Sequence, residues 1–350
     1  MPEHHIIGWD LGGAHLKTAW LDGAGSLRQV QQQATPLWQG LSHLGDALAR
    51  LAREWPLEEA DHYLTMTAEL VDRFEERRQG VAELAAFMAG RLPSERLWLY
   101  AGPAGFVSAA EAGRLPDAIA SANWYATSDW VARQQGEALL LDVGSTTADL
   151  LLLRSGRPDN RGYTDRERLA SGELVYTGVV RTPVMAVASR VPFGGAWQGL
   201  CAEHFANMAD VYRVLERLPA DADLHPSCDG RDKGPEASMR RLARMIGADL
   251  SDAGAEDWRQ LARYLAERQL DQLTRAALLQ CSRGLAPQAP FIGAGAGRFL
   301  VQQLADRLER PFLDIDALLG PAQSGELAPA VCAPAVAVAR LGQQESAPCN

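Results

Sequence analysis

The chain has 350 residues, of which 47% are hydrophobic and 22% charged, and its formal net charge at pH 7 is −10. This length exceeds what one compact core usually fills, so we expect two domains or lobes. The acidic balance, without any Lys/Arg-rich block, argues against nucleic acid or a membrane surface as the main partner. The apolar stretches are interrupted well before the roughly 20 residues of a spanning helix, and no basic leader is evident, so a cytoplasmic protein is expected.

The cysteines are scattered along the chain without a C-x-x-C spacing, which predicts free thiols in a reducing compartment. Cys201 and His204 could supply two zinc ligands, although two neighbours on a helix is the simpler interpretation. The five cysteines are Cys201, Cys228, Cys281, Cys332 and Cys349.

The first predicted element is a strand, a small turn and a returning strand over residues 4–22, HHIIGWDLGGAHLKTAWLD. The first strand ends at Asp10, and Lys17 lies just past the turn. A third strand over 27–36 and an amphipathic helix over 39–55 follow. The small residues of the turn are Gly12, Gly13 and Ala14.

Residues 62–74, HYLTMTAELVDRF, predict a strand, a polar turn that contains Glu69, and the start of a helix. A further helix is expected over 80–91 and a strand over 96–108. Residues 116–134 are expected to be helical or rich in loops.

A second copy of the opening pattern occupies residues 138–156, ALLLDVGSTTADLLLLRSG. Its first strand contains Asp142 near the end, and Asp149 lies on the other side of the turn. The turn itself is made of small polar residues, namely Gly144, Ser145, Thr146 and Thr147.

The remainder of the chain is predicted to be mainly helical, with short strands between 157 and 200 and helices over 203–218 and 236–285. Residues 289–308, APFIGAGAGRFLVQQLADRL, then predict a strand, a glycine-rich turn and a helix. The Ala/Val-rich residues 327–341 predict a helix buried against a sheet. The glycines of the late turn are Gly293, Gly295 and Gly297.

The small turns are suited to binding phosphate. A turn of Gly, Ser and Thr leaves backbone N–H groups free to point at an anion, and its glycines allow close approach. Asp10 and Asp142, at the strand ends, could hold a hydrated Mg²⁺ that bridges phosphates, and Lys17 could add a positive charge. Neither the P-loop spacing nor a Rossmann unit with its ribose-binding acid is present.

The order of three motifs resembles the superfamily of actin, sugar kinases and DnaK-type chaperones. WDLGGAHLK resembles its first phosphate motif, LDVGSTTADL its second and IGAGAGRFL its adenosine motif. The resemblance implies an α/β protein of two ribonuclease-H-like lobes with a phosphate cleft between them. We expect lobes at 1–134 and 135–350, the second with a mainly helical insertion at about 157–287. Phosphate contacts are then expected from all three turns, and magnesium at Asp10, Asp142 and Asp149.

Three further stretches, LTMTAELVDRFEERRQGV, SANW and DGRDKGPEASMRRLARMIG, resemble a narrower group. This group is related to hydantoinase A and oxoprolinase, is linked to tetrahydromethanopterin-dependent one-carbon metabolism, and includes a methanofuran-biosynthesis enzyme. The resemblance implies a transferase that makes methanofuran, or methylofuran in a methylotroph. A homodimer is a further expectation. An aminomethylfuran-methyl diphosphate would react with the phenol of γ-glutamyltyramine, and pyrophosphate would leave.

Such a phenol has a pKa of about 10, so at neutral pH it needs a base or a nearby cation. We expect Asp142 or Glu69 as the base, with Lys17 as the cation. His15 could contact phosphate or be an ordinary surface residue, and Trp124 could stack on an aromatic substrate or belong to the core.

Two other functions stay open from the sequence: an ATP-dependent small-molecule kinase or ATPase, and a nucleotide-binding regulator. The first motif has Ala14 and His15 where kinases commonly place Thr and a small or polar residue, which weakens the kinase hypothesis. The adenosine motif keeps ATP binding open.

Overall fold

The computed structural model describes residues 4–220 and 222–346. Its first sheet has six strands in the order β3-β2-β1-β4-β5-β6. In this sheet β1 pairs antiparallel with β2 and parallel with β4. The strands are β1 (His5–Leu11), β2 (His15–Leu21), β3 (Leu27–Ala34), β4 (Ala60–Met66), β5 (Leu97–Tyr100) and β6 (Phe106–Ser108).

The second sheet has the order β10-β8-β7-β13-β14, with the short β9 paired to β8. Here β7 pairs antiparallel with β8 and parallel with β13. The strands are β7 (Glu137–Val143), β8 (Ala148–Arg154), β9 (Arg157–Pro158), β10 (Leu174–Val175), β13 (Phe291–Ala294) and β14 (Phe312–Asp314).

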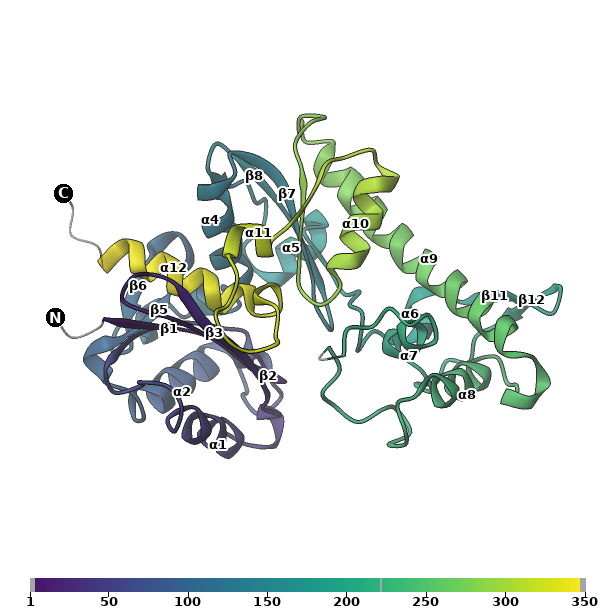
Figure 1. The fold of residues 1–350 in the computed structure, drawn as a ribbon, viewed down its shortest axis with the longest axis horizontal. Coiled ribbons are helices and arrows are strands. Elements are labelled where there is room, and N and C mark those ends of the chain that lie inside the picture. Colours follow the sequence, from purple (N-terminus) through teal and green to yellow (C-terminus); the bar gives the residue numbers. More distant parts are fainter. Residues whose placement is uncertain (1–3, 221, 347–350) are drawn as a thin grey trace.

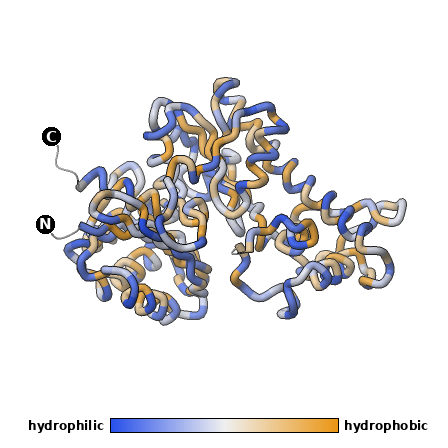
Figure 2. Tube along the Cα trace, in the orientation of Figure 1, coloured by the Kyte–Doolittle hydropathy of each residue, from blue (hydrophilic) through white to orange (hydrophobic). Residues whose placement is uncertain are grey.

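If the strands of each sheet are numbered in chain order and the short β9 is left out, both sheets have the strand order 3-2-1-4-5. The first sheet adds β6 at its edge. In both, an antiparallel hairpin comes first and parallel strands follow across helical connections. This repeated topology confirms the predicted fold class of two ribonuclease-H-like lobes. Figure 2 shows that hydrophobic segments follow the strands of the two sheets, where the core lies.

Two helices exchange partners between the lobes (Figure 1). The last helix, α12 (Ala333–Ser346), packs on β1, β2 and β4 of the first sheet, whereas α4 (Asn123–Gln134) packs on β7, β8 and β9 of the second. The two helices also pack on each other. Gly8 lets β1 approach α12, because a Cβ at this position would overlap the Ala335 carbonyl oxygen. The division at residues 134 and 135 stays a prediction, since both helices join the lobes across it.

On its other face the first sheet is covered by α1 (Ser42–Leu51) and α2 (Arg77–Ala89), which share a core with its strands. The predicted helices over 39–55 and 80–91 are therefore present with shifted ends. Residues 172–185, where short strands are predicted, form only the two-residue β10 and the start of α6 (Val184–Val187), a single turn of helix.

The segment between β10 and β13 extends away from the second sheet (Figure 1). Its regular structure is mostly helical, and its long helix α9 returns the chain to β13. Its elements are the hairpin β11 (Arg190–Phe193) and β12 (Ala196–Gly199), with α7 (Met208–Val214), α8 (Pro235–Met245) and α9 (Ala255–Cys281). The predicted insertion bounds of about 157–287 stay a prediction. Within residues 4–220 and 222–346, no helix combines the length and the apolar character needed to cross a bilayer.

Candidate active site

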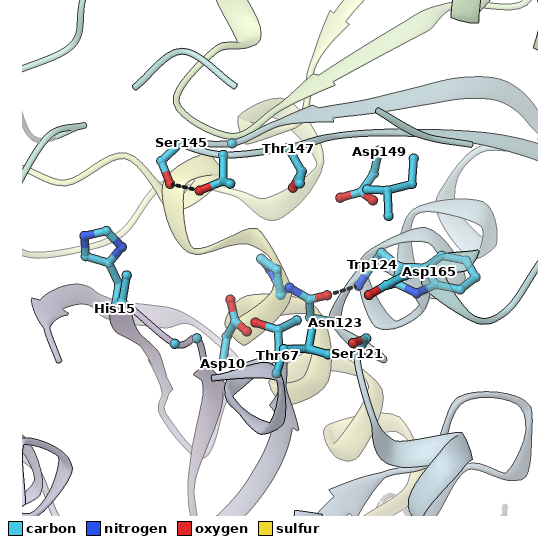
Figure 3. Close-up of a pocket in the computed structure, with 18 of the residues that line it drawn as sticks. Asp10, His15, Thr67, Ser121, Asn123, Trp124, Ser145, Thr147, Asp149 and Asp165 are labelled. Atoms are coloured by element: carbon cyan, nitrogen blue, oxygen red, sulfur yellow. Dashed lines mark hydrogen bonds between the residues drawn. The ribbon is translucent and has the colours of Figure 1, made fainter. Parts of the chain in front are cut away.

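A cavity of about 610 Å³ lies where the two hairpin turns face each other (Figure 3). One wall is the turn between β1 and β2, and the opposite wall is the turn between β7 and β8. The start of α4 and the turn after β4 close the remaining side. The two predicted phosphate-binding turns therefore share one cavity, although they are about 130 residues apart in sequence.

The first turn is held in shape by a hydrogen bond from the Gly12 amide to the His15 carbonyl, 2.9 Å. A Cβ at Gly12 would lie 2.8 Å from that carbonyl oxygen, which explains the glycine. The amides of Gly13 and Ala14 donate no hydrogen bond to another described residue. All three small residues of the turn line the cavity. Lys17, which lies opposite Asp10 in the β1–β2 register, lines it as well.

The second turn has the same construction, with the Gly144 amide donating to the Thr147 carbonyl at 2.9 Å. The amides of Ser145 and Thr146 have no acceptor among the described residues, and all four residues of the turn line the cavity. Free amides on both walls are suited to binding phosphate oxygens. Their role in this chain stays a prediction.

Two carboxylates at the strand ends carry perturbed pKa values. Burial raises the pKa of Asp10 to about 6, against the opposing effects of Lys17 and a hydrogen bond with Asn123. Burial, and then the neighbouring Asp149, raise the pKa of Asp142 to about 7; Asp10 adds to this. Both groups therefore resist ionisation until a cation is close.

The oxygens of these carboxylates are chemically suited to magnesium, whose binding here stays a prediction. Asp10 Oδ1 is buried and has no hydrogen-bond partner, so it is available as a ligand, and carboxylate oxygens are the donors that Mg²⁺ prefers. Asp149, the third predicted ligand, lines the cavity but is ion-paired with Arg168, whose Cζ lies 4.0 Å from the centre of the Trp124 ring. Accordingly, no cluster of three His, Cys, Asp or Glu side chains suited to a metal occurs in the described part of the chain.

Glu69, predicted as an alternative base, does not line the cavity. It is buried behind the wall, where the Ser121 hydroxyl donates to its Oε1 at 2.8 Å, and burial raises its pKa. Ser121 does line the cavity, so Glu69 reaches it only through this hydroxyl.

The glycines of the late turn are predicted to contact phosphate, yet none of Gly293, Gly295 and Gly297 lines the cavity. Gly295 has φ of +75°, and a Cβ there would overlap Asp142 Oδ1; a Cβ at Gly297 would overlap the Val143 side chain. The glycines let the turn between β13 and α10 (Arg298–Arg307) pack directly against the end of β7. In this structure Gly295 and Gly297 pack against the end of β7, and a role of the late turn in binding phosphate stays a prediction.

Several lining residues are not among the predicted site residues. Thr67 lies in the stretch LTMTAELVDRFEERRQGV and follows β4 at its carboxyl end, beside the end of β1, where its amide donates to the Leu11 carbonyl at 2.8 Å, so strand order could have suggested it. The others come from the start of α4, within SANW, or from the predicted insertion, where no motif marks them. They include Asn123, Arg168, Leu174, Tyr176 and Arg181.

A polar loop of the insertion, residues 223–234, reaches the first lobe. His225 packs against His15 with ring centres 4.8 Å apart and the rings tilted by 50°, and its ring centre lies 5.8 Å from that of Trp38. His15 is thus buried in the cavity wall rather than on the surface. Its pKa is lowered to about 3 by burial and by nearby positive charge, so it is neutral.

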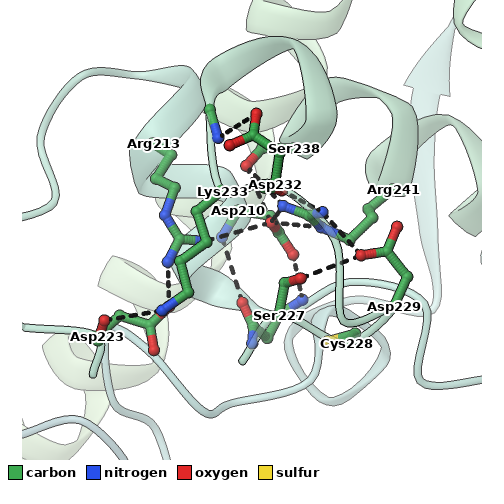
Figure 4. Close-up of polar contacts among 12 residues, drawn as sticks. Asp210, Arg213, Asp223, Ser227, Cys228, Asp229, Asp232, Lys233, Ser238 and Arg241 are labelled. Atoms are coloured by element: carbon green, nitrogen blue, oxygen red, sulfur yellow. Dashed lines mark hydrogen bonds and ion pairs between the residues drawn. The ribbon is translucent and has the colours of Figure 1, made fainter. Parts of the chain in front are cut away.

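A buried ion network shapes this loop (Figure 4). Arg241 of α8 bonds Asp210 of α7 at 2.7 Å and Asp229 of the loop at 3.0 Å, while Asp223 pairs with Arg213 and, at 3.4 Å, with Lys233. Asp223 and Asp229 therefore brace the loop.

The cysteines form no zinc site within the described ranges. His204 Nε2 contacts the Cys228 sulfur at 3.5 Å rather than Cys201. Cys201, Cys228, Cys281 and Cys332 are free thiols, and Cys349 lies outside the described residues.

A family model described as hydantoinase/oxoprolinase matches residues 62–345, which is most of the chain. The chain belongs to the hydantoinase/oxoprolinase family. Among its relatives is the (4-{4-[2-(gamma-L-glutamylamino)ethyl]phenoxymethyl}furan-2-yl)methanamine synthase of Methanocaldococcus jannaschii, 28% identical over 70% of this chain and 72% of that protein. The synthase of the same name from Methanococcus vannielii is 30% identical over 34% of this chain and 53% of that protein.

Among solved structures, this hydantoinase/oxoprolinase family member is similar to nucleotide-free acetone carboxylase, with a TM-score of 0.58 and 13% identity. The alignment covers 95% of this chain and 70% of that one. At this identity the similarity shows the fold alone, and it agrees with the two-lobed architecture.

Proposed function

We propose that this protein is a transferase of methanofuran or methylofuran biosynthesis that joins a furanylmethyl diphosphate to a phenol. The observation that carries the proposal is the pair of phosphate-type turns facing one cavity. It is supported by the relatives' name, whose product contains a phenoxymethyl-furan ether. A diphosphate leaving group needs donors for its phosphate oxygens, and turns of this kind can supply them.

The proposed reaction forms one C–O bond and breaks another. The phenol oxygen of γ-glutamyltyramine attacks the methylene carbon attached to the furan. The bond from that carbon to the diphosphate oxygen breaks, and its electron pair leaves with pyrophosphate. The phenolic proton passes to a base of the protein, so no oxidant and no ATP are consumed.

Each step has residues in the cavity suited to it. The free amides of Gly13, Ala14, Ser145 and Thr146 would hold the diphosphate and stabilise the charge that builds on it as it leaves. Lys17 adds a fixed positive charge beside Asp10. These groups act most strongly on the leaving pyrophosphate, which carries more charge than the ester, and so they lower the barrier.

Asp142 is the best candidate for the base. Its pKa near 7 leaves it able to accept a proton at neutral pH, whereas an ordinary aspartate is a much weaker base. Glu69 is behind the wall and is not positioned to touch a phenol directly. Magnesium, held by Asp10 and Asp142, would supply further charge neutralisation on the diphosphate. Asp142 could then act as the base only through a carboxylate oxygen that does not bind the ion.

The cavity also has an apolar end for aromatic rings. Leu70, Leu174 and Tyr176 are among its lining residues, and Figure 3 shows Trp124 on the side away from His15. Faces of this kind bind phenol and furan rings well. We therefore place the diphosphate between the two turns and the rings toward α4.

The test is to incubate the purified protein and Mg²⁺ with γ-glutamyltyramine and the aminomethylfuran-methyl diphosphate, and to follow ether by mass spectrometry and pyrophosphate by a coupled assay. We expect equal amounts of both products, formed only when both substrates are present and without ATP. ADP formation in proportion to a phosphorylated metabolite would instead establish the kinase. Slow ATP hydrolysis that responds to a protein partner would establish the regulator.

A further inference from the structure

Arg181 is fixed at the cavity by a segment that packs directly on the second turn. The Val179 amide donates to the Gly144 carbonyl at 3.0 Å, and the amides of Val180 and Arg181 donate to the Ser145 carbonyl at 3.1 and 2.8 Å. Gly178 allows this approach, because a Cβ there would overlap the backbone of the turn. The backbone of Arg181 is therefore positioned by the same turn that we assign to phosphate.

The guanidinium of Arg181 is exposed, lines the cavity, and has no ion-pair or side-chain hydrogen-bond partner among the described residues. The other cavity arginine, Arg168, is buried and neutralised by Asp149. A second carboxylate near the histidine pair, Asp223, already pairs with Arg213 and Lys233. Arg181 thus contributes an uncompensated positive charge to a cleft that already contains free amides.

The effect of this charge on His15 and His225 indicates where in the cavity it lies. After burial, Arg181 is among the groups that lower the pKa of both His15 and His225, together with Lys17 for His15 and Lys233 for His225; Asp223 opposes them. Arg181 therefore lies near the junction of the first turn and the insertion loop. Among the described residues that line this end of the cavity, the permanent cations are Lys17 and Arg181.

We propose that Arg181 binds the terminal phosphate of the diphosphate, the one remote from carbon, and so forms a subsite specific for diphosphates over monophosphates. A guanidinium can donate two parallel hydrogen bonds to a phosphate, which gives geometric selectivity as well as charge. The inference rests on the proposed function, because it names a recognition residue for the same leaving group. Lys17 and the turn amides hold the phosphate attached to carbon, and Arg181 holds the next one.

The test compares pyrophosphate with orthophosphate as probes, by calorimetric titration in the presence of Mg²⁺. We expect Arg181→Ala to weaken pyrophosphate binding by about 10- to 100-fold, the usual range for losing charge-assisted hydrogen bonds. Orthophosphate binding, which does not reach the subsite, should change much less. Arg181→Lys should be intermediate, since it keeps the charge but not the paired donors. Arg275→Ala removes an exposed arginine of α9 outside the cavity and should leave both affinities unchanged.

The outcomes separate the two proposals. If Arg181→Ala binds pyrophosphate as tightly as the wild-type protein, or loses both probes equally, the subsite is refuted while the transferase still stands. If the wild-type protein with Mg²⁺ binds no pyrophosphate, both are refuted. Each variant is first checked for an unchanged melting temperature, which we expect because the Arg181 side chain has no partner in the fold.

Discussion

Asp10 should destabilise the free protein at neutral pH, because folding buries a carboxylate that water would otherwise solvate. It is 4% exposed, and its pKa rises from 3.8 to about 6 on folding. The folded state therefore binds the proton more tightly than the unfolded state. It follows that the stability this proton provides is complete below pH 3.8 and is lost as the pH rises through 6. We predict that Asp10→Asn, which carries no charge at any pH, stabilises the protein at high pH.

The magnitude follows from the pKa difference. A shift of about 2.2 units is worth about 3 kcal/mol when Asp10 is fully ionised, since one unit corresponds to about 1.4 kcal/mol. The gain of Asp10→Asn in free energy of unfolding should therefore be about 3 kcal/mol larger at pH 8 than below pH 3.8. By the same linkage relation, the gain at pH 8 should exceed the gain at pH 5 by about half of this amount. Mg²⁺ should shrink the gain, because it stabilises the ionised wild-type carboxylate and not the amide.

The assay is urea unfolding at pH 5 and pH 8, with and without Mg²⁺, together with Asp46→Asn as a control. Asp46 is an exposed carboxylate on α1, so its variant should show no comparable pH dependence. A gain for Asp10→Asn that is the same at both pH values, or no gain at pH 8, would refute the explanation from burial. Persistence of the full gain in Mg²⁺ would argue against Asp10 as a ligand.

Three further predictions concern the surroundings of the same carboxylates. The rate of ether formation should fall about tenfold per pH unit below about 7, because protonation removes the Asp142 base; a pH–rate profile without this limb would exclude Asp142. Gly295→Ala should lower the free energy of unfolding by about 2 kcal/mol or more, because φ is +75° and the added Cβ would overlap Asp142 Oδ1; a thermal melt indistinguishable from wild type would contradict this packing. Arg168→Met should cost about 3 kcal/mol at pH 8, because it leaves the partly buried Asp149 without its partner; urea unfolding measures this, and Arg168→Met with Asp149→Asn should recover most of the loss.

Much of the fold follows from local patterns in the sequence. The apolar run of Leu139–Val143, the small turn and the second run are enough to predict a hairpin, because buried strands are short and glycine-bounded. The repeat of this pattern at His5–Leu21 then predicts two similar lobes. Helix ends are less predictable, since they depend on packing as well as on sequence.

The site is only partly predictable, because some of its residues are defined by tertiary contacts. Asp10 and Asp142 end strands and can be read directly. Arg181 is functional in our proposal only because Gly178 and its neighbours pack on a turn more than thirty residues earlier in the chain. The late glycines show the opposite case: a motif of the right kind is present, yet the structure uses Gly295 to pack against Asp142.

The exchange of α4 and α12 has a consequence for how the protein is made. The strands β1, β2 and β4 leave the ribosome early, but the helix that covers one of their faces, Ala333–Ser346, is synthesised much later. The nascent first lobe therefore exposes apolar surface until that helix has been translated, and such surface is prone to aggregation. Completing the lobe then requires contacts between segments that are far apart in the sequence, which slow folding. A stop codon before residue 333 would therefore damage the lobe that was translated first.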